Sequence, residues 1–167
     1  MLICTGFAGG LDPHVRAGDL VVADNFSTPE LSGLARALAG ERPHHFFGPL
    51  VTRQDPVEAV EAKAALAAES GALAVDMETA PVAEACLRAA VPLLAVRAIS
   101  DGAETALPVP FAHWFDRERQ RPRPWALVKY LARNPGQIAP FAHFVRGLSP
   151  AREALADFLV QFLSQPA

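Results

Sequence analysis

Cysteine is scarce in this sequence of 167 residues. Cys4 and Cys86 are the only two; they lie far apart, each in an apolar stretch, which argues against a disulfide framework and against a zinc knuckle. No run reaches the roughly 18 unbroken apolar residues of a membrane span. The first residues also lack the basic start and the apolar stretch of a signal peptide. These absences predict a soluble, cytoplasmic protein.

An overall positive charge is also lacking. The formal net charge is −3, so we do not expect the chain to bind nucleic acid. The charge is unevenly distributed, because residues 113–152 contain eight Lys or Arg and only two acids. Three interpretations of this basic segment stay open: a solvated surface, which we favour, a peripheral contact with an anionic membrane, or a contact with an acidic partner.

Several common catalytic motifs are missing as well. The sequence contains no G-x-S-x-G nucleophile elbow, no P-loop and no G-x-G-x-x-G. His44, His45 and His113 have no ligand-like spacing, and no Cys/His/Asp cluster indicates a metal. We therefore expect neither a metal nor an organic cofactor.

Apolar residues, in contrast, are abundant at 51%, enough for the core of a single domain over residues 1–167. Residues 74–101 are the most informative stretch. They contain the expected strand ALAVDM, a helix from Thr79 to Ala90 and the expected strand VPLLAVRAIS. Strand, helix and strand within about 30 residues form a βαβ unit, which predicts a parallel pair. With further strands expected at MLICTG, LVV and FFGPLVT and a helix over residues 56–70, the fold class is α/β.

The C-terminal part, residues 107–167, is predicted to be an extension packed on this domain. Residues 107–124 carry four prolines and the run DRERQRPRP, which indicates an exposed loop. Three helices should follow, in WALVKYLAR, QIAPFAHFVRGL and AREALADFLVQFLS. The last carries a stripe that we expect to dock on the core, namely Ala151, Leu155, Phe158, Leu159, Phe162 and Leu163.

Two acids bracket the helix–strand part of residues 74–101. Glu78 precedes the helix, and Asp101 follows the strand directly after Ser100. Each could simply cap or favour a helix start, and for each acid alone this is the better interpretation. However, ligands of parallel α/β sheets bind beyond the carboxyl ends of strands. The ends TGFAGG, DMET and SDGAET are therefore predicted to share one site.

Together these stretches resemble one family. GFAGGLDP followed by GDLVVAD, then VDMET and VPLLAVRAISD, in this order, is similar to the purine nucleoside phosphorylase and methylthioadenosine nucleosidase superfamily. The tail WALVKYLARNPGQIAPFAHFVRGL resembles the hopanoid-associated phosphorylase branch. The resemblance implies a three-layer sandwich with a mixed, mostly parallel central sheet, followed by C-terminal helices. It also implies cleavage of the bond between a purine, adenine above all, and its ribose, with an adenosylated hopanoid among the candidate substrates.

The resemblance gives the acid after the second strand a role on the base. Asp101, with Ser100 beside it, would donate a proton or a hydrogen bond to purine N7 as the base leaves. An ordinary aspartate is ionised at pH 7. Burial at a dry strand end would therefore have to favour the protonated form of Asp101.

The other candidate residues would hold the sugar. Glu78 would accept hydrogen bonds from the ribose 2′ and 3′ hydroxyls, and these would strengthen as the ribose becomes an oxocarbenium ion. Met77 would pack on the sugar face. Phe7, Ala8 and Gly9 would contact the substrate from the first strand end, where glycine lets the backbone approach a ligand closely.

The resemblance leaves the reaction open. The family domain normally opens with a strand, a glycine-containing phosphate loop and a further strand, so we expect an N-terminal part to be lacking here. Phosphate is a candidate co-substrate, but Phe7 and Cys4 stand where phosphorylases usually carry Ser or Thr and Arg. Cleavage by phosphate or water is the first interpretation. An inactive homologue that binds a nucleoside or a partner chain is the second, and an assembly subunit the third. Since homo-oligomers are usual for the family, we expect self-association.

Overall fold

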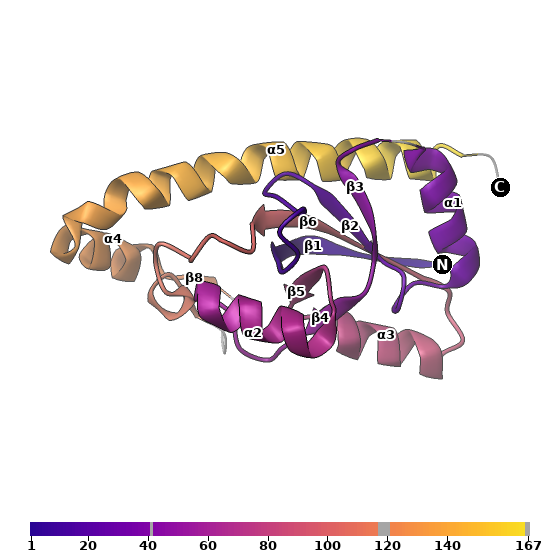
Figure 1. Cartoon of the computed structure of the whole chain (residues 1–167), viewed down its shortest axis with the longest axis horizontal. Helices are drawn as coiled ribbons and strands as arrows, with labels where there is room; N and C mark the ends of the chain where they lie inside the picture. Colours follow the sequence, from indigo (N-terminus) through magenta and orange to yellow (C-terminus); the bar gives the residue numbers. More distant parts are fainter. Residues whose placement is uncertain (41, 117–120, 166–167) are drawn as a thin grey trace.

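The computed structural model describes residues 1–40, 42–116 and 121–165. Its central sheet contains six strands and is flanked by five α-helices, with a two-stranded ribbon near the C-terminal part (Figure 1). In chain order the elements are β1 (Leu2–Gly10), β2 (Leu20–Ala23), α1 (Pro29–Ala39), β3 (His45–Gly48), β4 (Leu50–Thr52), α2 (Val60–Ser70), β5 (Ala74–Asp76), α3 (Thr79–Arg88), β6 (Leu93–Asp101), η1 (Phe111–His113), β7 (Phe115–Asp116), β8 (Arg121–Pro122), α4 (Pro124–Arg133), η2 (Pro135–Gln137) and α5 (Ile138–Leu163).

The sheet is mixed and mostly parallel, as predicted. Its strand order is β3-β2-β6-β1-β5-β4. The pairs β1–β6, β2–β3 and β4–β5 are parallel, whereas β1–β5 and β2–β6 are antiparallel. The predicted strand FFGPLVT is divided at Pro49 into β3 and β4, which lie at opposite edges of the sheet. Because one residue joins the two edges, the sheet must curl strongly.

Residues alternate between the two faces of the sheet with the period of two that strands impose. On β6, Leu94, Val96 and Ala98 pack with α1 and α5, while Ala95 and Ile99 pack on the opposite face. Helix α5 runs over one side of the sheet, and α2 and α3 lie on the other (Figure 1). This arrangement matches the predicted three layers.

The predicted parallel βαβ pair is wrong. β5 and β6 are not neighbours, because β1 lies between them, parallel to β6 and antiparallel to β5. The pattern of residues 74–101 gives the order of the elements along the chain, but it contains no information about a third strand inserted between them. As a result, the residues after β5 run back along β1 instead of ending beside Asp101.

The helices agree with the prediction in place but not always in extent. α2 begins at Val60 rather than at Pro56; it ends at Ser70 and is followed by the capping residue Gly71, whose φ of 63° suits glycine. α1 was not predicted. The two last predicted helices are one continuous helix, α5, which contains Pro150.

The stripe on α5 docks as predicted, with one exception. Ala151, Phe158 and Phe162 are buried in the core, and Leu155 and Leu159 pack against it. Leu163 is 62% exposed, so its place on the stripe is wrong. It is the last residue of α5.

The segment predicted to be an exposed loop is partly ordered. It contains η1 and the ribbon formed by β7 and β8, while its residues 117–120 lie outside the described residues. Within the described ranges, none of the helices has the length and apolar character that crossing a membrane requires.

Candidate active site

One cavity of about 480 Å³ lies along β1. Its wall is formed by β1, the loop before α2, the end of β5, the end of β6 and residues from the C-terminal part. All seven residues predicted for the site line this cavity: Phe7, Ala8, Gly9, Met77, Glu78, Ser100 and Asp101. The three strand ends therefore do share a site, although their strands are not all parallel.

Asp101 is a buried residue of the cavity wall and lies opposite Gly9 of β1. Its side chain is 5% exposed, and its Oδ1 lies 2.5 Å from the Ser100 Oγ. The Ser100 hydroxyl also lies 3.1 Å from the carbonyl oxygen of Ala8. No helix follows Asp101, because β6 leads into a turn. The alternative that Ser100 and Asp101 cap a helix is therefore wrong.

The partner of Asp101 is Lys63, which the sequence analysis missed. Lys63 comes from α2, its side chain is 0% exposed, and its Nζ forms an ion pair with the Asp101 Oδ2. The same ammonium group donates to the carbonyl oxygens of Gly102 at 2.9 Å and Thr105 at 2.8 Å. A cation in contact with a carboxylate favours its charged form. The burial that the sequence analysis considered for Asp101 is therefore accompanied by a direct ion pair.

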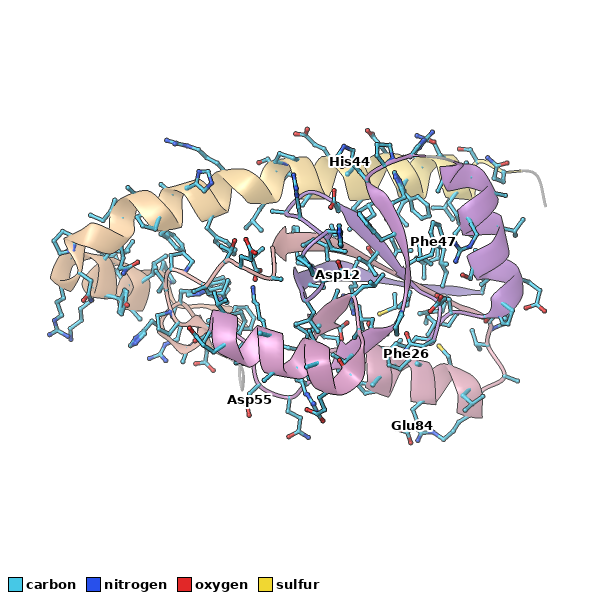
Figure 2. All side chains as sticks on the ribbon, in the orientation of Figure 1. Asp12, Phe26, His44, Phe47, Asp55 and Glu84 are labelled. Carbon is cyan, nitrogen blue, oxygen red and sulfur yellow. The ribbon has the colours of Figure 1, made fainter. Side chains whose placement is uncertain are left out.

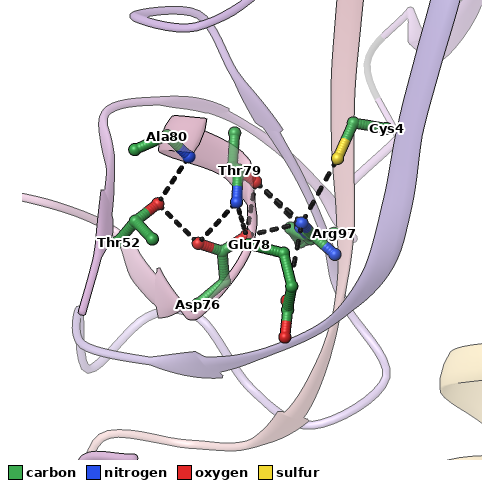
Figure 3. A network of polar contacts seen from close by, with 7 residues as sticks. All are labelled: Cys4, Thr52, Asp76, Glu78, Thr79, Ala80 and Arg97. Carbon is green, nitrogen blue, oxygen red and sulfur yellow. Dashed lines mark hydrogen bonds and ion pairs between the residues drawn. The ribbon is translucent and has the colours of Figure 1, made fainter. Parts of the chain in front are cut away.

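A second buried cation, Arg97, lies farther along the cavity, opposite Gly6 of β1, and Figure 3 shows its polar contacts. It lies on β6, within an otherwise apolar strand, and forms an ion pair of 2.6 Å with the buried Asp76. Arg97 also donates to the Thr79 Oγ1 at 2.8 Å and reaches the Cys4 Sγ at 3.4 Å. Asp76 accepts a further hydrogen bond of 2.7 Å from Thr52. Every charge in this network except that of Glu78 is buried and paired.

Glu78 carries the solvent-exposed carboxylate of the network. Its side chain is 61% exposed, and one of its oxygens lies 3.7 Å from Arg97. It occupies the N-cap position of α3 but makes no side-chain cap hydrogen bond. Glu84, in contrast, projects from the outer side of α3, away from the cavity (Figure 2), and pairs with Arg88. Glu78 can still favour the start of α3 through the helix dipole, and its exposed carboxylate is available to a ligand.

β1 forms the floor between these two ends. Phe7 is 42% exposed, unusually open for a phenylalanine on a central strand. Gly6 lies against the Arg97 guanidinium so closely that a Cβ there would collide with it. A Cβ on Gly9 would lie 3.4 Å from the Asp101 carboxylate. Glycines at both positions allow the two charged groups to lie against the strand.

The remaining wall is apolar and comes largely from residues beyond β6. Its members are Leu107, Phe111, Trp114, Phe144 and Leu148. The sequence analysis assigned these residues to a loop and to helices, and only the topology brings them to the cavity. Lys63 and Arg97 did leave a signal, since each is a lone cation within an apolar face or strand.

A metal is not indicated by the geometry. Within the described residues, no group of three or more His, Cys, Asp or Glu side chains could hold an ion. The two buried acids of the cavity, Asp101 and Asp76, are instead paired with Lys63 and Arg97.

Comparisons with known proteins agree with this arrangement. The profile of the phosphorylase superfamily matches residues 25–122. The 5′-methylthioadenosine/S-adenosylhomocysteine nucleosidase of Mycobacterium bovis is 25% identical over 149 residues, which cover 60% of this chain and 58% of that protein. The chain thus spans about three fifths of the length of this relative.

Solved structures show the same fold. The S-adenosylhomocysteine nucleosidase of Streptococcus pyogenes, solved with 5-methylthiotubericidin, superimposes with a TM-score of 0.67 at 21% identity, covering 99% of this chain and 68% of that one. The futalosine hydrolase of Helicobacter pylori gives a TM-score of 0.63 at 23% identity, covering 96% and 66%.

Proposed function

The chain belongs to the phosphorylase superfamily, whose profile covers more than half of it, and from this premise we propose that it cleaves the N-glycosidic bond of a purine nucleoside. One observation carries the proposal: a single cavity holds an exposed carboxylate, Glu78, at one end and a buried one, Asp101, at the other. The bond to be broken joins a sugar that gains positive charge to a base that gains negative charge. The exposed carboxylate suits the sugar, and the buried acid suits the base.

Glu78 binds the ribose in this proposal. Its carboxylate accepts hydrogen bonds from the 2′ and 3′ hydroxyls, and its negative charge stabilises the oxocarbenium ion more than the neutral sugar. Met77 and Phe7 line the cavity beside it and offer apolar surface to the sugar and base. Asp101 and Ser100 face the base and deliver the proton that it takes up as it leaves.

Water is the nucleophile that the local charges favour over phosphate. Among the described residues, Arg97 is the cation of this part of the cavity, and it is already matched by Asp76 and faces Glu78. A phosphate dianion would meet two carboxylates and one neutralised guanidinium, so it would be repelled. Phe7 also offers no hydroxyl to a phosphate group.

The relatives suggest an adenine nucleoside. Their names refer to 5′-methylthioadenosine and S-adenosylhomocysteine. The apolar wall of Leu107, Phe111, Trp114, Phe144 and Leu148 favours a substrate with a large apolar substituent. An adenosylated hopanoid is a substrate of this kind.

Helix α4 supports a peripheral contact with an anionic membrane, where such a lipid would be found. Trp125 is 84% exposed and Val128 56% exposed, and Lys129 and Arg133 lie on the same side of the helix. Residues 121–152 contain six Lys or Arg and no acid, so a like face of a second copy would be repelled.

Sedimentation with phosphatidylglycerol vesicles should fall in Trp125→Ala but not in Leu87→Ala, which removes an equally exposed leucine from α3. Equal binding to uncharged phosphatidylcholine vesicles, or none, would contradict this contact.

Base release tests the proposed reaction. Adenosine, 5′-methylthioadenosine and an adenosylated lipid are incubated with the wild type, with Asp101→Asn and with Asp157→Asn, an exposed acid on α5, in the presence and absence of phosphate. We expect release that is independent of phosphate and is lost only in Asp101→Asn, by about 10²- to 10⁴-fold. Nucleoside binding without release would support the inactive homologue instead.

A further inference from the structure

The hydrogen bonds of Lys63 identify the protonated form of this side chain. A lysine ammonium group has three N–H donors and no acceptor. The Lys63 Nζ has three acceptors around it, namely Asp101 Oδ2 and the carbonyl oxygens of Gly102 and Thr105. Each proton of the ammonium group therefore has one oxygen. A neutral amine would leave one of these buried contacts without a proton.

Asp101 is correspondingly arranged as a carboxylate. A carboxylate accepts but does not donate, and its two oxygens meet the Ser100 hydroxyl and the Lys63 ammonium. In this state Asp101 has no proton for the leaving purine. Of the two donors in contact with Asp101, the Lys63 ammonium is far more acidic than the Ser100 hydroxyl, so it is the proton source that a base could use through Asp101.

The choice of cation also differs between the two ends of the cavity. Arg97 pairs with Asp76 at the sugar end, and arginine keeps its proton under all ordinary conditions. At the base end the cation is a lysine, which gives up its proton far more readily when buried. An ion pair that served only to hold α2 against β6 would not need a cation that can release its proton.

We propose that Lys63 is the proton reserve of the site and that it acts through Asp101, an inference that rests on the proposed function. As the bond between C1′ and N9 breaks, its electron pair stays on the purine, and N7 takes a proton from the Asp101 carboxyl group. That group receives a proton from Lys63, which becomes a neutral amine. The attacking water adds to C1′ and loses a proton, and uptake of one proton restores the Lys63 ammonium.

Other charged groups do not compete for this role. Asp101 is the charged side chain in contact with Lys63 in the described part of the chain. Asp76 and Glu78 line the same cavity but belong to the Arg97 network, and Asp55 comes from the loop before α2. Lys63 touches no substrate in this scheme, so it is a positioning residue rather than a catalytic one.

Lys63→Arg is the sharpest test, because arginine preserves the charge but does not release its proton. Two substrates are compared: adenosine, whose base must be protonated to leave, and 4-nitrophenyl riboside, whose leaving group is a stable anion. We expect adenosine cleavage to fall by about 10²- to 10⁴-fold while nitrophenol release stays nearly unchanged. Lys129→Arg, at the only other lysine of the chain, is the matched control and should change neither rate.

The pH dependence of adenosine cleavage by Lys63→Met provides a second test. Without Lys63, only Asp101 itself can hold the proton, so adenosine cleavage by this variant should recover towards acidic pH, which a purely structural defect would not produce. Equal loss on both substrates, or no loss on adenosine, would overturn the role of Lys63. If the wild type releases no purine, the proposed function itself fails and the inference with it.

If both variants unfold, the pH dependence of the wild type tests the proposal instead. The ratio of adenine to nitrophenol release should then stay constant across the weakly acidic and neutral pH range, because the proton does not come from a free carboxyl group. A ratio that already declines above pH of about 4, where an isolated aspartate ionises, would contradict the proposal.

Discussion

The two ends of the cavity each pair a buried cation with a buried acid, but they differ in whether a second acid also faces the cation. At the base end, Lys63 and Asp101 satisfy one another, and both are almost completely buried. At the sugar end, Arg97 meets two acids; Asp76 takes the close contact at 2.6 Å, and Glu78 stays at 3.7 Å and 61% exposed. This comparison distinguishes acids that stabilise the fold from acids that can bind a ligand. Asp76 belongs to the first kind, Glu78 to the second, and Asp101 to both.

The largest expected effect on stability is at Asp76. Asp76→Asn leaves the Arg97 guanidinium buried without its counter-charge, and such a loss costs about 3–5 kcal/mol. Glu78→Gln removes an exposed carboxylate and should stay within about 0.5 kcal/mol of the wild type. The free energy of unfolding in urea measures both. Equal losses in the two variants would mean that Glu78 is as much a part of the fold as Asp76.

The base end should show coupling between its two charges. Lys63→Met and Asp101→Asn each leave a buried charge without its partner, whereas the double variant leaves none. We expect the double variant to be more stable than the sum of the single losses by about 0.5–3 kcal/mol. Urea unfolding of the four proteins gives this coupling energy. Additive losses would contradict a direct pair between Lys63 and Asp101.

The smallest effect concerns a polar group outside the cavity. The Nδ1 of His45 on β3 is buried and has no hydrogen-bond partner among the described residues. Burial, followed by the charges of Arg42 and His44, lowers the pKa of His45 below its usual 6.5. The unfolded chain therefore binds a proton below about pH 6.5 that the native state resists, and stability falls with acidification. His45→Gln cannot titrate, so its unfolding free energy should decline less between pH 7 and pH 5. An unchanged slope would mean that this histidine does not contribute to acid sensitivity.

The sequence predicts much of the fold because its local patterns are strong. The apolar run of β6 and the position of Pro81 in the first turn of α3 correspond to real elements. The insertion of β1 between β5 and β6 is not local, and neither is the division of FFGPLVT at Pro49. Both depend on pairing between segments that lie far apart in the chain, which no stretch of ten residues specifies.

The candidate site shows the same limit. Its acids are visible because they stand at strand ends, where polar groups have a reason to be. Lys63 is hidden in an alanine-rich helix, and its burial depends on α2 lying over Asp101. Phe144 and Leu148 lie more than forty residues beyond Asp101 along the chain and join the cavity only because α5 passes over the sheet.

The measurement that tests this account most directly is adenine release from 5′-methylthioadenosine by the wild type, Glu78→Gln and Glu84→Gln, with the unfolding free energy of each protein measured in parallel. Glu84 is an exposed glutamate on the same helix and serves as the matched control. The account predicts release by the wild type and Glu84→Gln, and a rate lower by about 10²- to 10³-fold in an equally stable Glu78→Gln. Equal rates in all three proteins, or no release by the wild type, would contradict it.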